Sequence, residues 1–215
     1  MKNILLIGTG RFGSHIAKKL NDMNNQVLAI DKDEEKINAI LPFVTSAQIG
    51  DSTNEEFLDT LGIRNFDACI VAIGDSFQNS LETVYLLKEK GAKYVIARAC
   101  RDVQQKFLLR NGADEVVYPE KQLGTWTAIR CTSKNILDYI EVDECHIFEI
   151  LVPEKWYGKT VQELDVRRRY NLNILGIRKE GGKMHMNVGP DTVMQPGSSI
   201  LVLGSDLDIR ICFNV

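Results

Sequence analysis

A glycine-rich turn between two short apolar segments constrains this chain more than any other feature. Residues 4–7 are apolar, Gly8-Thr9-Gly10-Arg11-Phe12-Gly13 follows, and a second apolar segment ends at Asp31, eighteen residues beyond Gly13. Gly-x-Gly-x-x-Gly between a strand and a helix, with an acid after the next strand, is typical of dinucleotide-binding βαβ units. The sequence therefore predicts a nucleotide site at this turn, and the alternative is a glycine turn that binds nothing.

Each glycine has its own expected task. Gly8 makes the tight turn out of the strand, Gly10 lets a phosphate approach the backbone, and Gly13 lets the helix pack closely on the sheet. The helix that begins near Arg11 directs free N–H groups and its positive dipole end at the phosphates. We expect Asp31 to accept hydrogen bonds from both ribose hydroxyls, which disfavours NADP.

Length and charge narrow the class of protein. The chain has 215 residues, 44% of them hydrophobic, and a formal net charge of −3. This length suits one large domain, or one medium domain with a small one. A negative net charge argues against nucleic acid or an anionic membrane as the main partner. No apolar stretch approaches the roughly 18 residues of a membrane span, and a strand pattern directly after Met-Lys-Asn leaves no room for a signal peptide. We expect a cytoplasmic protein without direct membrane insertion.

The cysteines lack the spacing of a metal site. No two of them form a Cys-x-x-Cys pair, and most lie in apolar segments. We therefore expect reduced, structural thiols and no zinc site. The five are Cys69, Cys100, Cys131, Cys145 and Cys212.

Strands and helices alternate over the first part of the chain. Two helix starts carry cap signals: Thr53 with Glu56 three residues later predicts a capping box, and Asp102 predicts the cap of another helix. The strand–helix alternation occurs six times, which predicts an α/β fold with a Rossmann-like, doubly wound parallel sheet of six strands. The strands are expected at residues 4–7, at a segment ending at Asp31, and at 44–49, 68–73, 94–97 and 115–118.

The pattern changes after a helix expected at residues 121–136. Thr160 begins a capped helical turn, and Gly/Pro/Asp turns punctuate short strands. This predicts a small α+β domain of a different type. We expect two domains, residues 1–137 with the crossover helix and residues 145–215. The short strands are expected at residues 146–152, 173–177, 184–188 and 199–203.

Polar residues follow the predicted parallel strands. In doubly wound sheets, ligands bind beyond the carboxyl ends of the strands, near the point where strand order reverses. Arg11 and Arg98 can bind phosphates, and Glu120 can hold a divalent cation such as Mg²⁺. Asp51 and Asp75 can instead be ordinary helix caps, and Arg11 and Glu120 ordinary solvated residues. The complete predicted site is Gly8, Thr9, Gly10, Arg11, Phe12, Gly13, Asp31, Lys32, Asp51, Ser52, Ile73, Gly74, Asp75, Arg98 and Glu120.

An enzymatic function has little support in the sequence. A dehydrogenase needs an acid–base residue beside the nicotinamide and a substrate pocket. None of the three histidines, His15, His146 and His185, falls where that acid is expected, and the second domain is small for a substrate domain. The sequence favours a binding protein, with an NAD-dependent oxidoreductase as the alternative.

A positive segment marks the predicted second domain. Arg167-Arg168-Arg169 precedes Asn173, and such a run usually forms a solvated face. Together with His185 and Pro190 it can instead bind a second phosphate-bearing ligand.

These motifs together resemble a known family. Gly-Thr-Gly-Arg-Phe-Gly, Asp31, Gly50-Asp51-Ser52-Thr53 and Arg98 are similar to the RCK (KTN) domain, which regulates potassium transport. Leu-Val-Pro-(x)4-Gly-Lys-Thr-(x)3-Leu and the closing Met-Gln-Pro-Gly-Ser-Ser-Ile-Leu-Val-Leu-Gly resemble its C-terminal companion domain. The resemblance covers essentially the whole chain, and the nearest likeness is to the cytosolic regulatory subunits of bacterial Ktr/Trk-type potassium uptake systems.

The resemblance implies a regulator and not an enzyme. It implies a homodimer that assembles into an octameric ring beneath a membrane-embedded potassium transporter subunit. ATP against ADP, or NAD against NADH in many Trk-type members, changes the shape of the ring. By the same likeness Arg11 reaches a γ-phosphate, Glu120 holds a cation, and Arg167–Arg169, Asn173 and His185 take part in cyclic di-AMP binding. An apolar helix face at Leu123, Trp126 and Ile129 suits either a swapped dimer contact or packing within its own domain. A free-standing nucleotide sensor without a membrane partner is a further alternative.

Overall fold

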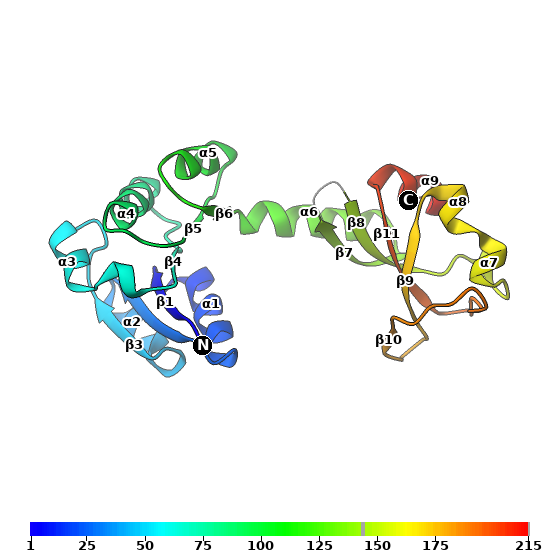
Figure 1. The fold of residues 1–215 in the computed structure, drawn as a ribbon, viewed down its shortest axis with the longest axis horizontal. Coiled ribbons are helices and arrows are strands. Elements are labelled where there is room, and N and C mark those ends of the chain that lie inside the picture. The colour runs from blue at the N-terminus through cyan, green and yellow to red at the C-terminus, as the bar shows by residue number, and fades with distance from the viewer. Residues whose placement is uncertain (143–144, 215) are drawn as a thin grey trace. The chain divides into compact units, whose positions relative to one another are not determined.

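The structure is a computed structural model that describes residues 1–142 and 145–214. The chain divides into two compact units, Met1–Lys121 and Gln122–Val215 (Figure 1). Within the described residues, none of the helices combines the length and the apolar character that crossing a membrane requires.

The first unit is a six-stranded parallel sheet with the strand order β3-β2-β1-β4-β5-β6. Strand order reverses beside β1, since β2 and β3 continue the sheet on one side of it and β4 to β6 on the other. The predicted fold class is confirmed. The elements are β1 (Asn3–Ile7), α1 (Arg11–Asp22), β2 (Gln26–Asp31), α2 (Glu34–Ile40), β3 (Ser46–Ile49), α3 (Glu55–Thr60), β4 (Ala68–Val71), α4 (Phe77–Glu89), β5 (Val95–Arg98), α5 (Asp102–Arg110) and β6 (Glu115–Val117).

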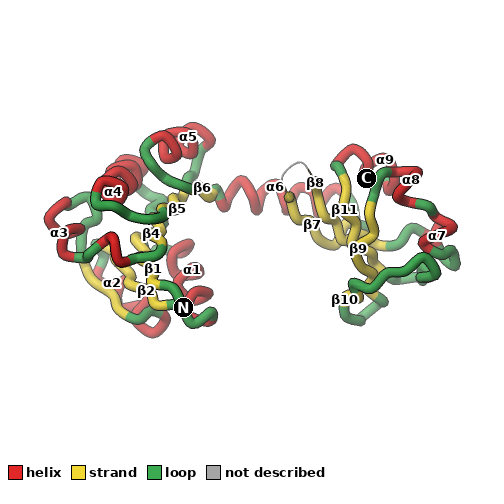
Figure 2. Tube along the Cα trace, viewed as in Figure 1, coloured by secondary structure: helices red, strands yellow, loops and turns green. Residues whose placement is uncertain are grey.

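Helices cover both faces of this sheet (Figure 2). Leu5 and Ile7 of β1 belong to a core that includes residues of α3, α4 and α5, whereas Ile4 and Leu6 belong to a core that includes residues of α1 and α2. Because successive side chains of a strand point to opposite faces, a strand covered on both sides must be apolar throughout. This explains the uninterrupted apolar sequences of residues 4–7 in β1 and of β4.

Two predicted helix caps are wrong. Asn54, not Thr53, caps α3, because its Oδ1 accepts the Phe57 N–H at 3.1 Å. Thr53 instead donates its N–H and its hydroxyl to Asp51 Oδ1. Arg101 is the N-cap residue of α5, and Asp102 is its first helical residue.

The second unit contains a five-stranded antiparallel sheet with the order β10-β9-β11-β8-β7. Phe148, Ile150 and Val202 from the sheet pack with Val166 and Ile209 from its helices. The capped turn predicted at Thr160 is present, with a complete capping box to Glu163. The elements are β7 (Ile136–Val142), β8 (Cys145–Leu151), α7 (Val161–Leu164), α8 (Val166–Tyr170), β9 (Asn173–Arg178), β10 (Met184–His185), β11 (Ser199–Gly204) and α9 (Asp206–Phe213).

The connection between the two predicted domains differs from the expectation. The helix is α6 (Pro119–Thr132), and residues expected at the domain boundary form β7. Trp126 and Ile129 of α6 pack against the core of the second unit, and Trp126 Nε1 donates to Asp138 Oδ1 at 3.1 Å. Leu123 on the same helix is 64% exposed. The sequence left two alternatives for this apolar face, a dimer contact or packing within its own domain. Trp126 and Ile129 pack within their own unit.

Candidate functional site

A cavity of about 350 Å³ opens at the carboxyl ends of β1, β2 and β4, where strand order reverses. This volume lies at the small end of the range for ligand pockets, and the position is where doubly wound sheets bind their ligands. The cavity is lined by Ile7, Gly8, Gly10, Arg11, Ile30, Asp31, Lys32, Lys36, Gly50, Asp51, Ser52, Ala72, Ile73, Gly74, Asp75, Asn79 and Arg98.

The glycine turn brings the start of α1 to this cavity. Gly8 has φ of 91°, a left-handed conformation that favours glycine. A Cβ on Gly13 would lie 2.0 Å from the Gly8 carbonyl oxygen, so no other residue fits there without a backbone shift. A Cβ on Gly10 would have nothing within 4 Å. Gly13 thus permits close helix–strand packing, and Gly10 leaves room beside the cavity.

The first turn of α1 has free hydrogen-bond donors. Gly10 occupies the N-cap position and has no side chain that could accept from the following N–H groups. Since the first N–H groups of a helix have no partner within the helix, a phosphate oxygen can bind them. The turn can therefore bind an anion.

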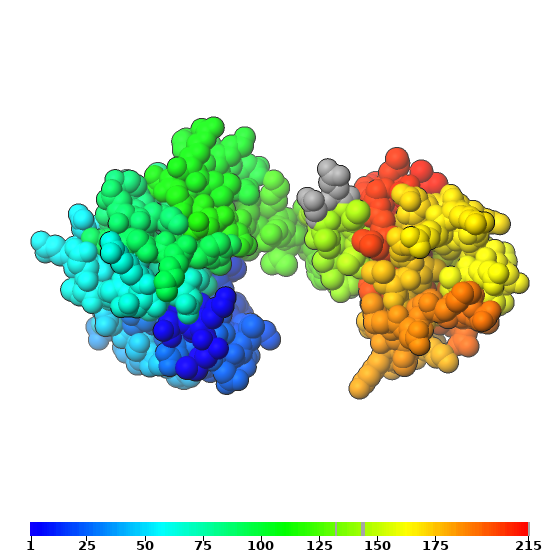
Figure 3. Space-filling view, viewed as in Figure 1, coloured from blue at the N-terminus to red at the C-terminus, as the bar shows by residue number. Residues whose placement is uncertain are grey.

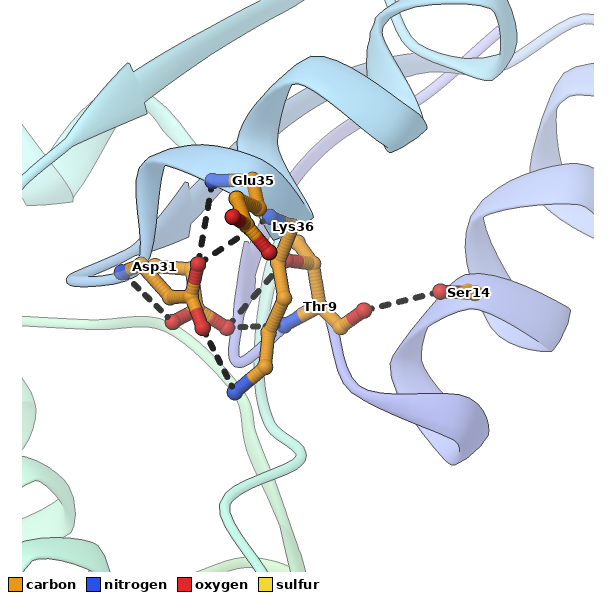
Figure 4. Close-up of polar contacts among 6 residues, drawn as sticks. Thr9, Ser14, Asp31, Glu35 and Lys36 are labelled. Carbon is orange, nitrogen blue, oxygen red and sulfur yellow. Dashed lines mark hydrogen bonds and ion pairs between the residues drawn. The ribbon is translucent and has the colours of Figure 1, made fainter.

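Asp31 is held in place by the glycine turn. Its Oδ2 accepts the Thr9 N–H at 2.8 Å and the Thr9 hydroxyl at 3.1 Å, and its Oδ1 accepts the Asp33 N–H at 3.1 Å. Figure 4 shows this contact and the hydrogen bond from Ser14 Oγ to the Thr9 carbonyl oxygen. The end of β2 and the turn after β1 thus form one hydrogen-bonded unit.

Arg98 reaches the cavity from the end of β5. Its guanidinium lies over the Phe12 ring, 5.4 Å from the ring centroid, and forms an ion pair with Glu120. A Cβ on Gly74 would lie 2.5 Å from Arg98 Nη1, so the guanidinium packs on the Gly74 backbone. Arg98 is oriented by these contacts and can present its remaining N–H groups to a phosphate.

Asp51 is an acidic group on the β3 side of the cavity. The Thr53 N–H, the Thr53 hydroxyl and the charge of Lys32 hold the pKa of its carboxyl below the usual value. It is therefore ionised at neutral pH and can accept hydrogen bonds from a ligand. Next to it, Ser52 Oγ is hydrogen-bonded to Thr83 Oγ1 in the interior.

Most predicted site residues line the cavity, and four do not. Thr9 donates to Asp31, and Gly13 packs against Gly8. Phe12 packs against the Arg98 guanidinium, and Glu120 of α6 forms an ion pair with Arg98. Lys36 and Asn79 also line the cavity, although the sequence did not predict them as site residues. Both lie in the first turn of a helix that follows a strand of the site. A polar residue at that position in the sequence could have identified them as site residues.

Glu120 was also predicted as a cation ligand. Its side chain is 55% exposed and its carboxylate is engaged by Arg98. Within residues 1–142 and 145–214, no group of three or more His, Cys, Asp or Glu side chains is arranged to hold a metal ion. Glu120 by itself supplies one carboxylate, so phosphate oxygens of a bound nucleotide would have to complete the coordination.

The residues predicted to bind a second ligand lie on the second unit. Arg167, Arg168 and Arg169 are exposed on α8, which lies at the surface of that unit (yellow in Figure 3). Asn173 pairs with Leu203 at one end of β9, and His185 pairs with Ile177 nearer the other end. Four residues along a strand separate these positions by about 13 Å. Asn173 and His185 therefore lie at different positions along the sheet, and the three arginines lie on α8.

Family models match both units. Residues 4–119 match the TrkA-N domain and residues 145–210 match the TrkA-C domain. The chain belongs to the TrkA-N/TrkA-C family. The resemblance to RCK (KTN) regulators is confirmed by these matches and by the relatives described next.

The relatives of this chain include a potassium uptake protein. Ktr system potassium uptake protein C of Bacillus subtilis (strain 168) is 39% identical over 209 residues, which cover 97% of this chain and 94% of that protein. The solved structure of the GsuK channel bound to NAD matches 97% of this chain and 38% of its own chain, with a TM-score of 0.67 and 19% identity. GsuK bound to ADP matches 63% of this chain and 36% of its own, with a TM-score of 0.55 and 18% identity. The likeness to GsuK shows the fold.

The two glycines of the turn predict different effects on stability. Gly13→Ala should lower the free energy of unfolding by about 2 kcal/mol or more, because the added methyl group overlaps the Gly8 carbonyl oxygen. Gly10→Ala should cost less than about 1 kcal/mol, because its methyl group meets no atom within 4 Å and only the N-cap preference changes. Urea denaturation followed by circular dichroism measures both. Equal losses would contradict the assigned packing.

Proposed function

We propose that this chain is a nucleotide-sensing regulatory subunit that assembles as a ring in the cytoplasm and gates a membrane-embedded potassium transporter. The arrangement of the cavity carries the proposal. Asp31 suits a ribose, and Arg11, Arg98 and the free N–H groups of α1 suit a chain of phosphates. The relationship to Ktr system potassium uptake protein C supports potassium transport as the regulated process.

ATP and ADP are the proposed ligands. Both share the ribose and two phosphates, so a regulator must distinguish them at the third phosphate. Arg11 lies in the glycine turn and lines the cavity, and its guanidinium can form charge-assisted hydrogen bonds with that phosphate. A ligand shifts a conformational equilibrium only by its differential affinity for the two states. In this proposal Arg11 therefore contacts the γ-phosphate in one ring shape, and a cation bound by Glu120 and the phosphates assists it.

NAD and NADH are the second candidate ligands. GsuK structures bound to NAD and to ADP share the fold of this chain. The ADP part of NAD could form the same contacts with the glycine turn and with Asp31 as ADP itself. An NAD-dependent oxidoreductase would require substrate turnover, which an assay of NADH consumption against small substrates would reveal.

The partners follow from the same proposal. Residues 1–137 bind the nucleotide, and residues 145–215 contribute to a homodimer that builds an octameric ring. The transporter subunit supplies the membrane anchor, so the ring lies at the inner face of the membrane. Cyclic di-AMP is the proposed ligand of the second domain, where Arg167–Arg169, Asn173, His185 and Pro190 would contact it across a dimer.

Potassium flux tests the function directly. We expect the chain to co-purify with a Ktr-type membrane subunit and to give faster potassium uptake into proteoliposomes with ATP than with ADP. The expected difference is about tenfold, which corresponds to a coupling free energy of about 1.4 kcal/mol, within the usual range of about 1–3 kcal/mol. Failure to bind the membrane subunit, or uptake that is indifferent to every nucleotide, would contradict the proposal.

Arg11 tests the discrimination of ATP from ADP. Arg11→Ala should weaken ATP binding about tenfold or more, because one charge-assisted hydrogen bond contributes about 1.5–3 kcal/mol, and should change ADP binding by less than about threefold. Isothermal titration calorimetry measures both affinities. Arg101→Ala is the matched control, since Arg101 is exposed outside the cavity and its loss changes the net charge equally. Equal weakening of ATP and ADP in Arg11→Ala would show that Arg11 does not contact the third phosphate.

A further inference from the structure

Thr9 makes contacts that its place in the glycine motif does not require. It stands between Gly8 and Gly10, a position where the motif accepts any residue. Its side chain is nevertheless buried, with 3% exposure, and its hydroxyl donates to Asp31 Oδ2 at 3.1 Å (Figure 4). Its N–H donates to the same oxygen at 2.8 Å. Thr9 thus binds one carboxylate oxygen of Asp31 at two points.

These hydrogen bonds leave little acceptor capacity on Asp31. A carboxylate has about four acceptor sites, two on each oxygen. Thr9 uses both sites of Oδ2, and the Asp33 N–H uses one site of Oδ1. One acceptor site remains, on Oδ1. A single ribose hydroxyl can therefore donate to the remaining site of Asp31.

The same contacts fix the orientation of the carboxylate. The terminal torsion of an aspartate is broad and roughly two-fold, so an unrestrained carboxylate can rotate. The Thr9 hydroxyl and the backbone N–H groups of Thr9 and Asp33 restrain that rotation. Asp31 lines the cavity in this restrained state. A ligand hydroxyl then binds a group that has already lost its rotational freedom, which favours affinity.

We propose that Thr9 is a positioning residue that makes the site select a ribonucleotide through one ribose hydroxyl. Thr9 acts through Asp31 and touches no ligand atom. The inference rests on the proposed nucleotide binding and adds to it the origin of ribose selectivity.

The test compares ADP with 2′-deoxy-ADP and 3′-deoxy-ADP by isothermal titration calorimetry. ADP is chosen because ATP and NAD both contain it. In the unmodified chain, one deoxy analogue should bind about tenfold more weakly than ADP, and the other should bind within about twofold of ADP. In Thr9→Val, the affinity for ADP should fall toward the affinity for the more weakly bound deoxy analogue. The ratio of these two affinities should then be below about threefold. Thr9→Ser, which retains the hydroxyl, should restore the tenfold ratio.

Ser14→Ala is the matched control. Ser14 Oγ donates to the Thr9 carbonyl oxygen at 2.8 Å, so this variant also removes one hydroxyl hydrogen bond from the turn but leaves the Asp31 contacts intact. The ratio between ADP and the weaker analogue should stay near tenfold. Thr9→Ala replaces Thr9→Val if the valine variant does not fold.

Four results would overturn the inference. A tenfold ratio that survives in Thr9→Val or Thr9→Ala would show that the hydroxyl does not position Asp31. Equal weakening of ADP and both analogues in these variants would indicate a structural role alone. ADP binding without any ribose preference in the unmodified chain would remove this inference but leave the proposed function, whereas no binding of ADP, ATP or NAD would remove both.

Discussion

The contact between Gly13 and Gly8 determines where everything else in the site can lie. Because Gly13 has no Cβ, α1 starts against the carbonyl of Gly8, and its first turn meets the carboxyl end of β1. The same turn presents the Thr9 N–H and hydroxyl to Asp31, so the ends of β1 and β2 are joined by hydrogen bonds as well as by sheet pairing. One close backbone contact thus places a helix end that can bind an anion and the Asp31 carboxylate at the edges of a single cavity.

Positively and negatively charged side chains both line the cavity. Arg11 and Arg98 supply positive charge that could bind phosphates, and Asp31 and Asp51 supply carboxylate oxygens that could accept from hydroxyl or base groups. Arg98 is already oriented by Phe12, Gly74 and Glu120, so its pairing with a phosphate needs little further ordering. Arg11 has no such fixed arrangement in the contacts described above. This difference makes Arg98 suited to a phosphate that every ligand has, and Arg11 suited to one that only some ligands have.

The sequence predicted the first unit well, because β1, β2 and β4 are largely apolar segments that end at, or shortly before, a glycine or an acidic residue. It predicted the second unit less completely. In β7, the buried Ile136 and Tyr139 are three residues apart and the register shifts after Ile136, so the alternation that reveals a strand is broken. The cap of α3 was mistaken because Ser52, Thr53 and Asn54 stand side by side and each can cap a helix, so only the final backbone geometry selects one. The cap of α5 was mistaken because the extended residue before the helix is Arg101, which makes Asp102 the first helical residue. Lys36 and Asn79 reach the cavity from helices, and the pairing of Glu120 with Arg98 joins α6 to β5, so both depend on tertiary packing.

In the proposed function, the cavity at the reversal of strand order binds an adenine nucleotide whose phosphates regulate the protein. Calorimetric titration of the unmodified protein with ATP, ADP, NAD and NADH, each with and without Mg²⁺, tests it most directly. We predict saturable binding of ATP and ADP, with Mg²⁺ changing the difference between them. Tight NADH binding with indifference to ATP would replace ATP and ADP by a dinucleotide in this account. Absence of binding for all four would contradict the assignment of the glycine turn on which the account depends.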